Sequence, residues 1–347
     1  MKKNKKIIFN LIFFILLIVV TFYVLLKDQN IFDIFNMMIN SNKAFVLIAI
    51  FCMFLYLLLE GVNLLRTIRI SGNKDIKLTS AFKYALIGFF FSAITPAASG
   101  GQPMQVYYMH KDKISIANST LSLLINLTSM QVVTICFALI SLFFNYQYLN
   151  PVLIVCFIIG IALNSSALAL LLIGIFSKRL SKGLMNFVLK VLKFFKFKNI
   201  EEKRQKFEDE LYKYQQSAIY IRNNRKLMLI TLLTTLLQFT IYYSITYWVY
   251  RALGFNEYNI VQIITMQSVL FATVSGIPSP GAVGVSEGAF IEIFRNVYPK
   301  HMISSAVLLN RGINFYLYVF ICGIVTIINH FKRGKGSSED VVEEELI

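Results

Sequence analysis

The sequence predicts an all-α protein that crosses a membrane several times, and three observations lead to this fold class. Hydrophobic residues make up 56% of the 347 residues, charged residues make up 15%, and the mean hydropathy is +0.63. A soluble protein of this length needs far more charge on its surface. Most apolar residues lie in runs of about twenty or more, the length at which a helix crosses about 30 Å of hydrocarbon. Two further apolar stretches are interrupted in the middle by proline and glycine.

Each long apolar run is predicted to be a helix, because backbone amides in lipid must be satisfied within the chain. The first run follows a lysine-rich start and is longer than the apolar region of a signal peptide, so we expect an uncleaved span. Six full spans are expected at residues 7–26, 44–65, 118–144, 152–176, 227–250 and 303–329. The two interrupted stretches are residues 81–110 and 258–295.

The distribution of Lys and Arg predicts on which side each loop lies, because cytoplasmic loops carry the excess of positive charge. It places both termini on the cytoplasmic side and predicts that both flanks of 81–110 are cytoplasmic. Both flanks of 258–295 are predicted to be external. The interrupted stretches then enter the membrane from opposite faces as re-entrant helical hairpins. Such a pair is typical of an inverted repeat built around a site at the membrane midplane.

Four segments follow from this topology: a first membrane half at 1–176, a basic segment at 177–226, a second membrane half at 227–332 and a disordered acidic tail at 333–347. The basic segment contains fourteen Lys and Arg against five Asp and Glu. Its part 184–198 fits a helix on anionic lipid and equally a helix packed on the protein's own cytoplasmic face. Residues 201–214 are predicted to form a solvated helix.

The composition also argues against several classes of function. The formal charge of +16 comes from residues between the apolar runs rather than from a basic folded surface, so we expect no nucleic-acid partner. The four cysteines lie in apolar stretches and the three histidines are scattered, so we expect no metal site. No Walker-type loop is found, and we expect no cofactor and no catalytic residue.

The two interruptions are the most informative motifs. The first is Thr-Pro-Ala-Ala-Ser-Gly-Gly-Gln-Pro at 95–103, and the second begins Gly-Ile-Pro-Ser-Pro-Gly-Ala-Val-Gly at 276. Proline and glycine stop an α-helix, and unwound backbone at membrane depth must face protein or a watery cavity. The freed amides at the start of the following helices can hold an anion such as a lipid phosphate. The candidate binding residues in these motifs are Ser99, Gly100, Gly101, Gln102, Pro278, Pro280, Gly281 and Gly284. The alternative is a pair of kinks that allow close helix packing.

Four charged residues near the hydrocarbon complete the candidate site. Glu60 either faces a cationic headgroup or pairs with Arg66 near the cytoplasmic end of its span. Glu287 lies in the first turn of a restarted helix, where an acid also simply complements the helix dipole. Arg311 lies about two turns into the last span. A bare charge is costly at that depth, so we expect Arg311 to pair with Glu287 or with a substrate phosphate.

The motifs at 96–103 and 278–287, the second ending in Gly-Val-Ser-Glu, resemble the lysylphosphatidylglycerol synthase transmembrane region. This is the flippase-like, N-terminal membrane part of the multiple peptide resistance factor, which also exists as stand-alone membrane proteins. The likeness covers about residues 7–330. It implies a phospholipid translocase of a bacterial-type cytoplasmic membrane, acting on phosphatidylglycerol or lysylphosphatidylglycerol.

The same resemblance leaves alternatives open. It implies a phosphatidylglycerol lysyltransferase, or its membrane subunit, that uses lysyl-tRNA and contributes to resistance against cationic peptides. No acyltransferase domain is seen within the 347 residues, so we expect translocation rather than lysyl transfer. A third alternative is a membrane assembly partner without transport. Association of several copies of the chain is compatible with all three.

Overall fold

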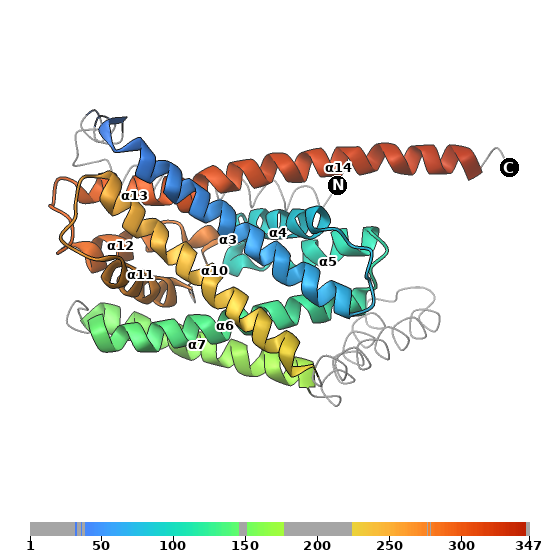
Figure 1. Ribbon diagram of the computed structural model, residues 1–347, viewed down its shortest axis with the longest axis horizontal. Coiled ribbons are helices and arrows are strands. Elements are labelled where there is room, and N and C mark those ends of the chain that lie inside the picture. The colour runs from blue at the N-terminus through green and yellow to red at the C-terminus, as the bar shows by residue number, and fades with distance from the viewer. Residues whose placement is uncertain are drawn as a thin grey trace.

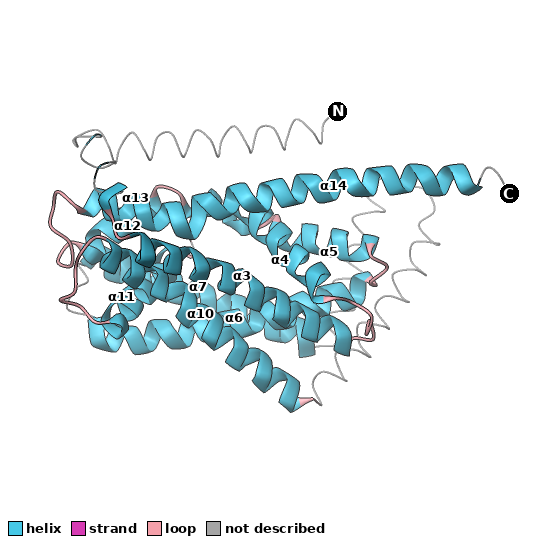
Figure 2. Ribbon diagram, turned by 45° about the horizontal axis from the view of Figure 1, so that its top comes forward, coloured by secondary structure: helices cyan, strands magenta, loops and turns pink. Residues whose placement is uncertain are grey.

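The computed structural model describes residues 39–145, 151–176, 224–275, 277 and 279–344, together with Phe32 and Asn36. These residues form helices and loops, and no strand occurs among them (Figure 2). The predicted first span at 7–26, most of the basic segment 177–226 and Pro278 lie outside the described residues.

Five helical segments are long and apolar enough to cross a membrane, and they confirm five of the six predicted spans. They are α3 (Lys43–Ile70), α6 (Ile116–Asn145), α7 (Pro151–Phe176), α10 (Arg225–Ala252) and a segment of three consecutive helices. The last segment contains α13 (Ile303–Arg311), the π-helix η4 (Gly312–Tyr316) and α14 (Leu317–Glu344). The chain is therefore a multi-pass membrane protein.

Large apolar side chains cover the outer faces of these helices. On α7 they are Val152, Val155, Ile158, Ile159, Leu163 and Leu170, each at least about half exposed. A water-soluble protein does not expose so large a contiguous apolar surface. These faces are suited to contact with lipid.

Each interrupted stretch forms a helix–break–helix hairpin. The first contains α4 (Leu78–Ala93), the 3₁₀ turn η1 (Pro96–Ala98) and α5 (Gly101–Lys111). The second contains α11 (Ile260–Val274), the 3₁₀ turn η3 (Pro280–Ala282) and α12 (Val285–Phe294). Their first helices have 16 and 15 residues, about 24 Å at 1.5 Å per residue, which is too short to cross the hydrocarbon. In each hairpin the second helix packs back on the first, which is the arrangement expected of the re-entrant hairpins that the sequence predicts.

The hairpins approach each other from opposite ends of the molecule. In both views α4 and α5 lie toward the right end and α11 and α12 toward the left end (Figures 1 and 2). Their breaks, η1 and η3, are in contact. The neighbouring helices repeat the same relationship, since α3 precedes one hairpin and packs along α10, which precedes the other. Likewise α6 packs on α11, and α14 packs on α4. This is the predicted inverted repeat.

The two breaks share a local sequence and a backbone path. Thr-Pro-Ala-Ala-Ser-Gly at 95–100 aligns with Ser-Pro-Gly-Ala-Val-Gly at 279–284. In each, proline starts the turn and the next two residues adopt left-handed backbone angles, with φ of 51° and 53° at Ala97 and Ala98 and 58° and 52° at Gly281 and Ala282. Such angles in alanine cost about 1–3 kcal/mol and persist only where the surroundings impose them. Contact between the two breaks is such a surrounding.

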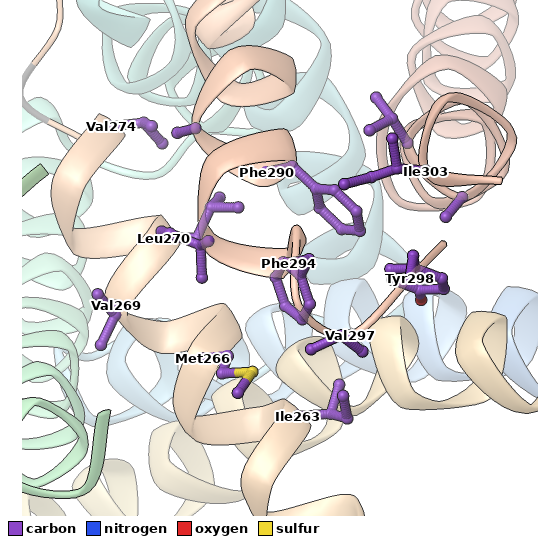
Figure 3. Close-up of a cluster of buried hydrophobic side chains, with 14 of the residues drawn as sticks. Ile263, Met266, Val269, Leu270, Val274, Phe290, Phe294, Val297, Tyr298 and Ile303 are labelled. Carbon is purple, nitrogen blue, oxygen red and sulfur yellow. The ribbon is translucent and has the colours of Figure 1, made fainter. Parts of the chain in front are cut away.

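A hydrophobic cluster holds the second hairpin together (Figure 3). Side chains of α11, such as Met266 and Leu270, and side chains of α12 belong to it. The rings of Phe290 and Phe294 stack with centroids 4.4 Å apart, and Tyr298 extends the aromatic packing. This packing fixes α12 against α11, and so it fixes the position of the break between them.

At the C-terminal end the structure differs from the sequence prediction. Helix α14 continues to Glu344, through most of the segment 333–347 that we predicted to be disordered. Glu, Lys and Val are compatible with a helix that is already formed, so charge alone does not determine where α14 ends.

Candidate functional site

A cavity of about 220 Å³ lies where the two breaks meet. The first break contributes Ala97 and Ala98, and the second contributes Ser279, Gly281 and Ala282. Helices α4, α10, α11, α12, α13 and η4 supply the rest of the wall. The polar residues that they and the second break add are Ser92, Tyr242, Gln267, Ser275, Ser279, Ser286, Asn310 and Asn314, together with Arg311. A cavity enclosed by protein within a membrane fold is a setting in which unwound backbone is tolerated.

A buried ion pair adjoins this cavity. Arg311 Nε lies 2.9 Å from Glu287 Oε1, and the two side chains are 9% and 2% exposed. Arg311 Nη2 also donates to the Gly281 carbonyl at 2.9 Å. The pairing expected from the sequence is therefore present, and it ties the last span to the second break. Such a pair is stable only when the remaining hydrogen-bonding capacity of both ions is used.

The Glu287 carboxylate is held by three donors. Besides Arg311, the Gly284 amide donates to Oε2 at 2.7 Å and the Tyr316 hydroxyl donates to Oε1 at 3.2 Å. Glu287 occupies the third position of α12 and caps the helix through Gly284, whose φ of 84° favours glycine. The amide at the start of α12, where we expected an anion to bind, thus has the protein's own carboxylate as its partner.

The π-helix η4 determines how the last span presents its polar groups. It starts directly after Arg311 and extends from Gly312 to Tyr316. The Arg311 guanidinium carbon lies 4.2 Å from the centroid of the Phe315 ring, a cation–π contact that orients the guanidinium. Asn314 from the same turn lines the cavity. Single π-helical turns inside α-helices are frequent at functional sites.

Two polar atoms beside the cavity are buried without a partner among the described residues. They are Asn314 Oδ1 and Ser279 Oγ. Both residues line the cavity, and Asn314 is 4% exposed. Buried polar atoms in native structures are nearly always hydrogen-bonded, so these two orphan atoms are available to a ligand or water in the cavity.

The other amides of the cavity are arranged by a threonine on α10. The hydroxyl of Thr246 lies 2.9 Å from Gln267 Oε1 and 3.1 Å from Asn310 Oδ1. The Thr246 hydroxyl has one hydrogen, so it donates to one of these two amide oxygens at a time. Thr246 is 1% exposed, so this arrangement is fixed within the core.

The first break contributes less to the cavity than the sequence predicts. The Gly100 amide donates to Thr95 Oγ1 at 2.9 Å, so this amide already has a partner. A Cβ atom on Gly101 would lie 2.0 Å from Ser92 Oγ and 2.8 Å from the Gly88 carbonyl oxygen, so Gly101 permits α5 to pack on α4. Ser99 is exposed, and neither it nor Gln102 lines the cavity.

Glu60 and Arg66 lie away from the cavity and are not paired with each other. Arg66 Nη1 donates to Asn63 Oδ1 at 2.8 Å, and Asn63 in turn bonds Thr235 of α10. Glu60 interacts with the side chain of Gln105 on α5. Tyr56 lies near Glu60, and its ring packs 4.8 Å from that of Tyr242, which lines the cavity. Glu60 is thus connected to the cavity through two tyrosines rather than by contact.

The sequence prediction missed the uncharged half of the site. Asn310, Asn314, Gln267 and Thr246 meet at the cavity, although they come from four different helices, α13, η4, α11 and α10. In the sequence, each of these residues is an amide or hydroxyl side chain within a long apolar run. This pattern is a weak indication of a site, because many such side chains hydrogen-bond their own backbone.

Comparison with known proteins agrees with the structure. No curated protein and no solved structure matches the chain. The model of one protein family, described as the lysylphosphatidylglycerol synthase TM region, matches residues 7–322, which is most of the chain. With its re-entrant hairpins and multi-pass architecture, the chain therefore belongs to the lysylphosphatidylglycerol synthase transmembrane-region family.

Proposed function

We propose that this protein is a lipid translocase, which moves the polar headgroup of a phospholipid across the membrane through the cavity between the two breaks. The observation that carries the proposal is the contact of two re-entrant breaks beside a buried ion pair. The orientation that we propose places the basic loops and both termini in the cytoplasm of a bacterial-type cell.

The energetic problem of lipid translocation is the dehydration of the headgroup. Burying a charged or polar group in hydrocarbon without partners is prohibitive, whereas the acyl chains are at no disadvantage there. The cavity provides amides, hydroxyls and one guanidinium near the middle of the fold. It thereby supplies partners for a headgroup where the barrier is highest.

The inverted repeat supports a mechanism of alternating exposure. Because the two hairpins enter from opposite ends, a small tilt of one half against the other opens the cavity toward one side at a time. The Arg311 bonds to Glu287 and Gly281 connect the last span with the second hairpin, so these elements would move together.

A headgroup-accessibility assay in proteoliposomes tests this function. An acyl-chain-labelled phosphatidylglycerol in the inner leaflet becomes open to an impermeant quencher only after its headgroup has crossed. Wild-type protein should accelerate this process over protein-free liposomes, and Glu287→Gln should slow it because Arg311 loses its partner. Equal rates with and without protein would refute the proposal.

The matched control is Glu292→Gln on the same helix. Glu292 forms an exposed pair with Arg295 at 3.6 Å, so its neutralisation removes one carboxylate from α12 without touching the cavity. We expect the wild-type rate from this variant. The double variant Glu287→Gln with Arg311→Met separates an effect on folding from an effect on transport. It leaves no buried charge unpaired, so it should fold, but it lacks the guanidinium and should still transport slowly.

A further inference from the structure

We infer that the cavity selects anionic phospholipids with an uncharged, hydroxylated headgroup of the glycerol type, and that it disfavours the lysyl headgroup. This inference rests on the proposed function and adds the substrate class of the same site. Three features of the cavity carry it: its charge, its donors and its orphan acceptors.

The charge of the cavity wall is unsuited to a cationic headgroup. Among the described residues, Arg311 is the one charged side chain that lines the cavity, and no carboxylate lines it. Glu287 lies behind Arg311 and already accepts hydrogen bonds from three groups. A lysyl headgroup brings two ammonium groups, and a buried cation needs a carboxylate or an equivalent partner.

The donors of the wall match a phosphodiester. Nε and Nη2 of Arg311 are bonded to Glu287 and Gly281, and the guanidinium held in this way lines the cavity. Gln267 and Asn310 also line the cavity, and each has an amide nitrogen that can only donate. A guanidinium with neighbouring amide donors is a favourable partner for phosphate oxygens, which can only accept.

The orphan atoms match a hydroxylated headgroup. Asn314 Oδ1 accepts hydrogen bonds and cannot donate, and it lacks a partner among the described residues. Ser279 Oγ lacks one as well. The hydroxyls of a glycerol headgroup both donate and accept, so they satisfy both atoms, whereas the trimethylated headgroup of phosphatidylcholine offers no donor.

The first test compares three acyl-chain-labelled lipids in the same proteoliposome assay: phosphatidylglycerol, phosphatidylcholine and lysylphosphatidylglycerol. Wild-type protein should move phosphatidylglycerol about tenfold faster than either of the others, the ratio that corresponds to one lost hydrogen bond to a charged group. Equal or faster movement of the lysyl lipid would overturn the substrate class and leave the translocase intact. No movement of any lipid above protein-free liposomes would remove the proposed function as well.

The second test uses two variants of the wall. Asn314→Leu has similar size and removes the orphan acceptor, so it should keep or raise the thermal stability while phosphatidylglycerol transport falls to the phosphatidylcholine rate. Arg311→Gln leaves Glu287 uncompensated, so it should raise the rate of the lysyl lipid relative to phosphatidylglycerol. The control Arg295→Gln, on an exposed side chain, should leave the ratio unchanged. An unchanged ratio in Arg311→Gln would contradict the assignment.

A final arm distinguishes the lipid from a free solute with the same chemistry. Deacylated phosphatidylglycerol, which is water-soluble, is enclosed in the vesicles and its release is measured. We expect wild-type protein to retain it, because the acyl chains remain in lipid during headgroup movement. Release faster than from protein-free vesicles would overturn the assignment to a lipid headgroup.

Discussion

A Cβ atom on Gly281 would lie 2.1 Å from the Cζ atom of Phe315. Gly281 belongs to the second break and Phe315 to the π-helix of the last span, so the two elements meet with no space for a side chain. The φ of +58° at Gly281 is a second, independent reason for glycine at this position. Phe315 in turn packs against the Arg311 guanidinium, so this contact positions the ion pair.

Gly281→Ala should therefore destabilise the protein. The added methyl group displaces the Phe315 ring, and overpacking of this kind costs about 1–3 kcal/mol. Thermal unfolding of the purified protein in detergent should show a lower midpoint. A second substitution, Phe315→Leu, should recover part of the loss because it removes the ring atoms that clash.

The control is Gly288→Ala in α12, where an added Cβ meets nothing within 4 Å. This residue lies in a regular helix, so alanine should be neutral or stabilise by about 0.5–1 kcal/mol. If Gly281→Ala and Gly288→Ala unfolded at the same temperature, the close contact with Phe315 would not exist in solution.

The Glu287–Arg311 pair should show strong energetic coupling. Removing one partner of a buried ion pair leaves an uncompensated charge and costs about 3–5 kcal/mol. Glu287→Gln and Arg311→Met alone should each lower the unfolding midpoint substantially. The double variant should be more stable than the sum of the two single losses predicts, because no charge remains buried. Strict additivity in this double-mutant cycle would mean that the two side chains do not interact.

Thr246 should stabilise the uncharged half of the cavity. Thr246→Val keeps the shape of the side chain and removes the hydroxyl that bonds the Gln267 and Asn310 amides. Leaving a buried acceptor without its donor costs about 1–3 kcal/mol, so the unfolding midpoint should fall. On the same helix, Thr240→Val removes a hydroxyl that bonds back to the Leu236 carbonyl, and it should change the stability little. An equal effect of both variants would argue against a special role for Thr246.

The sequence predicts the framework of this fold well, because the membrane leaves few alternatives. Long apolar runs must be helices in lipid, and the proline and glycine residues after Ile94 and Val274 cannot continue them. The loop charges then predict the inverted arrangement, and the contact between η1 and η3 agrees with it. Even the ion pair was predictable, since Arg311 at that depth requires a partner.

The detailed wall of the site was not predictable, for two physical reasons. The choice of which amides face the cavity depends on helix rotation, and the π-helix after Arg311 changes that rotation for Asn314 without a clear sequence signal. The Gly284 amide donates a hydrogen bond to Glu287, three residues further along the chain. The position that suits an external anion is therefore already occupied. The sequence pattern alone does not distinguish these two uses of a helix start.

Because the two hairpins enter from opposite ends, we predict that Lys111 and Arg295 are accessible from opposite sides of the membrane. Lys111 ends α5 and Arg295 follows α12, and these two helices lie toward opposite ends of the molecule (Figure 1). In intact cells, an impermeant maleimide should therefore label Arg295→Cys and should label Lys111→Cys only after permeabilisation. The unsubstituted protein measures the background from its native cysteines, of which Cys52 and Cys322 are buried. Labelling of both positions from the same side would mean that one hairpin crosses the membrane, and the cavity could not then serve headgroups from the two leaflets alternately.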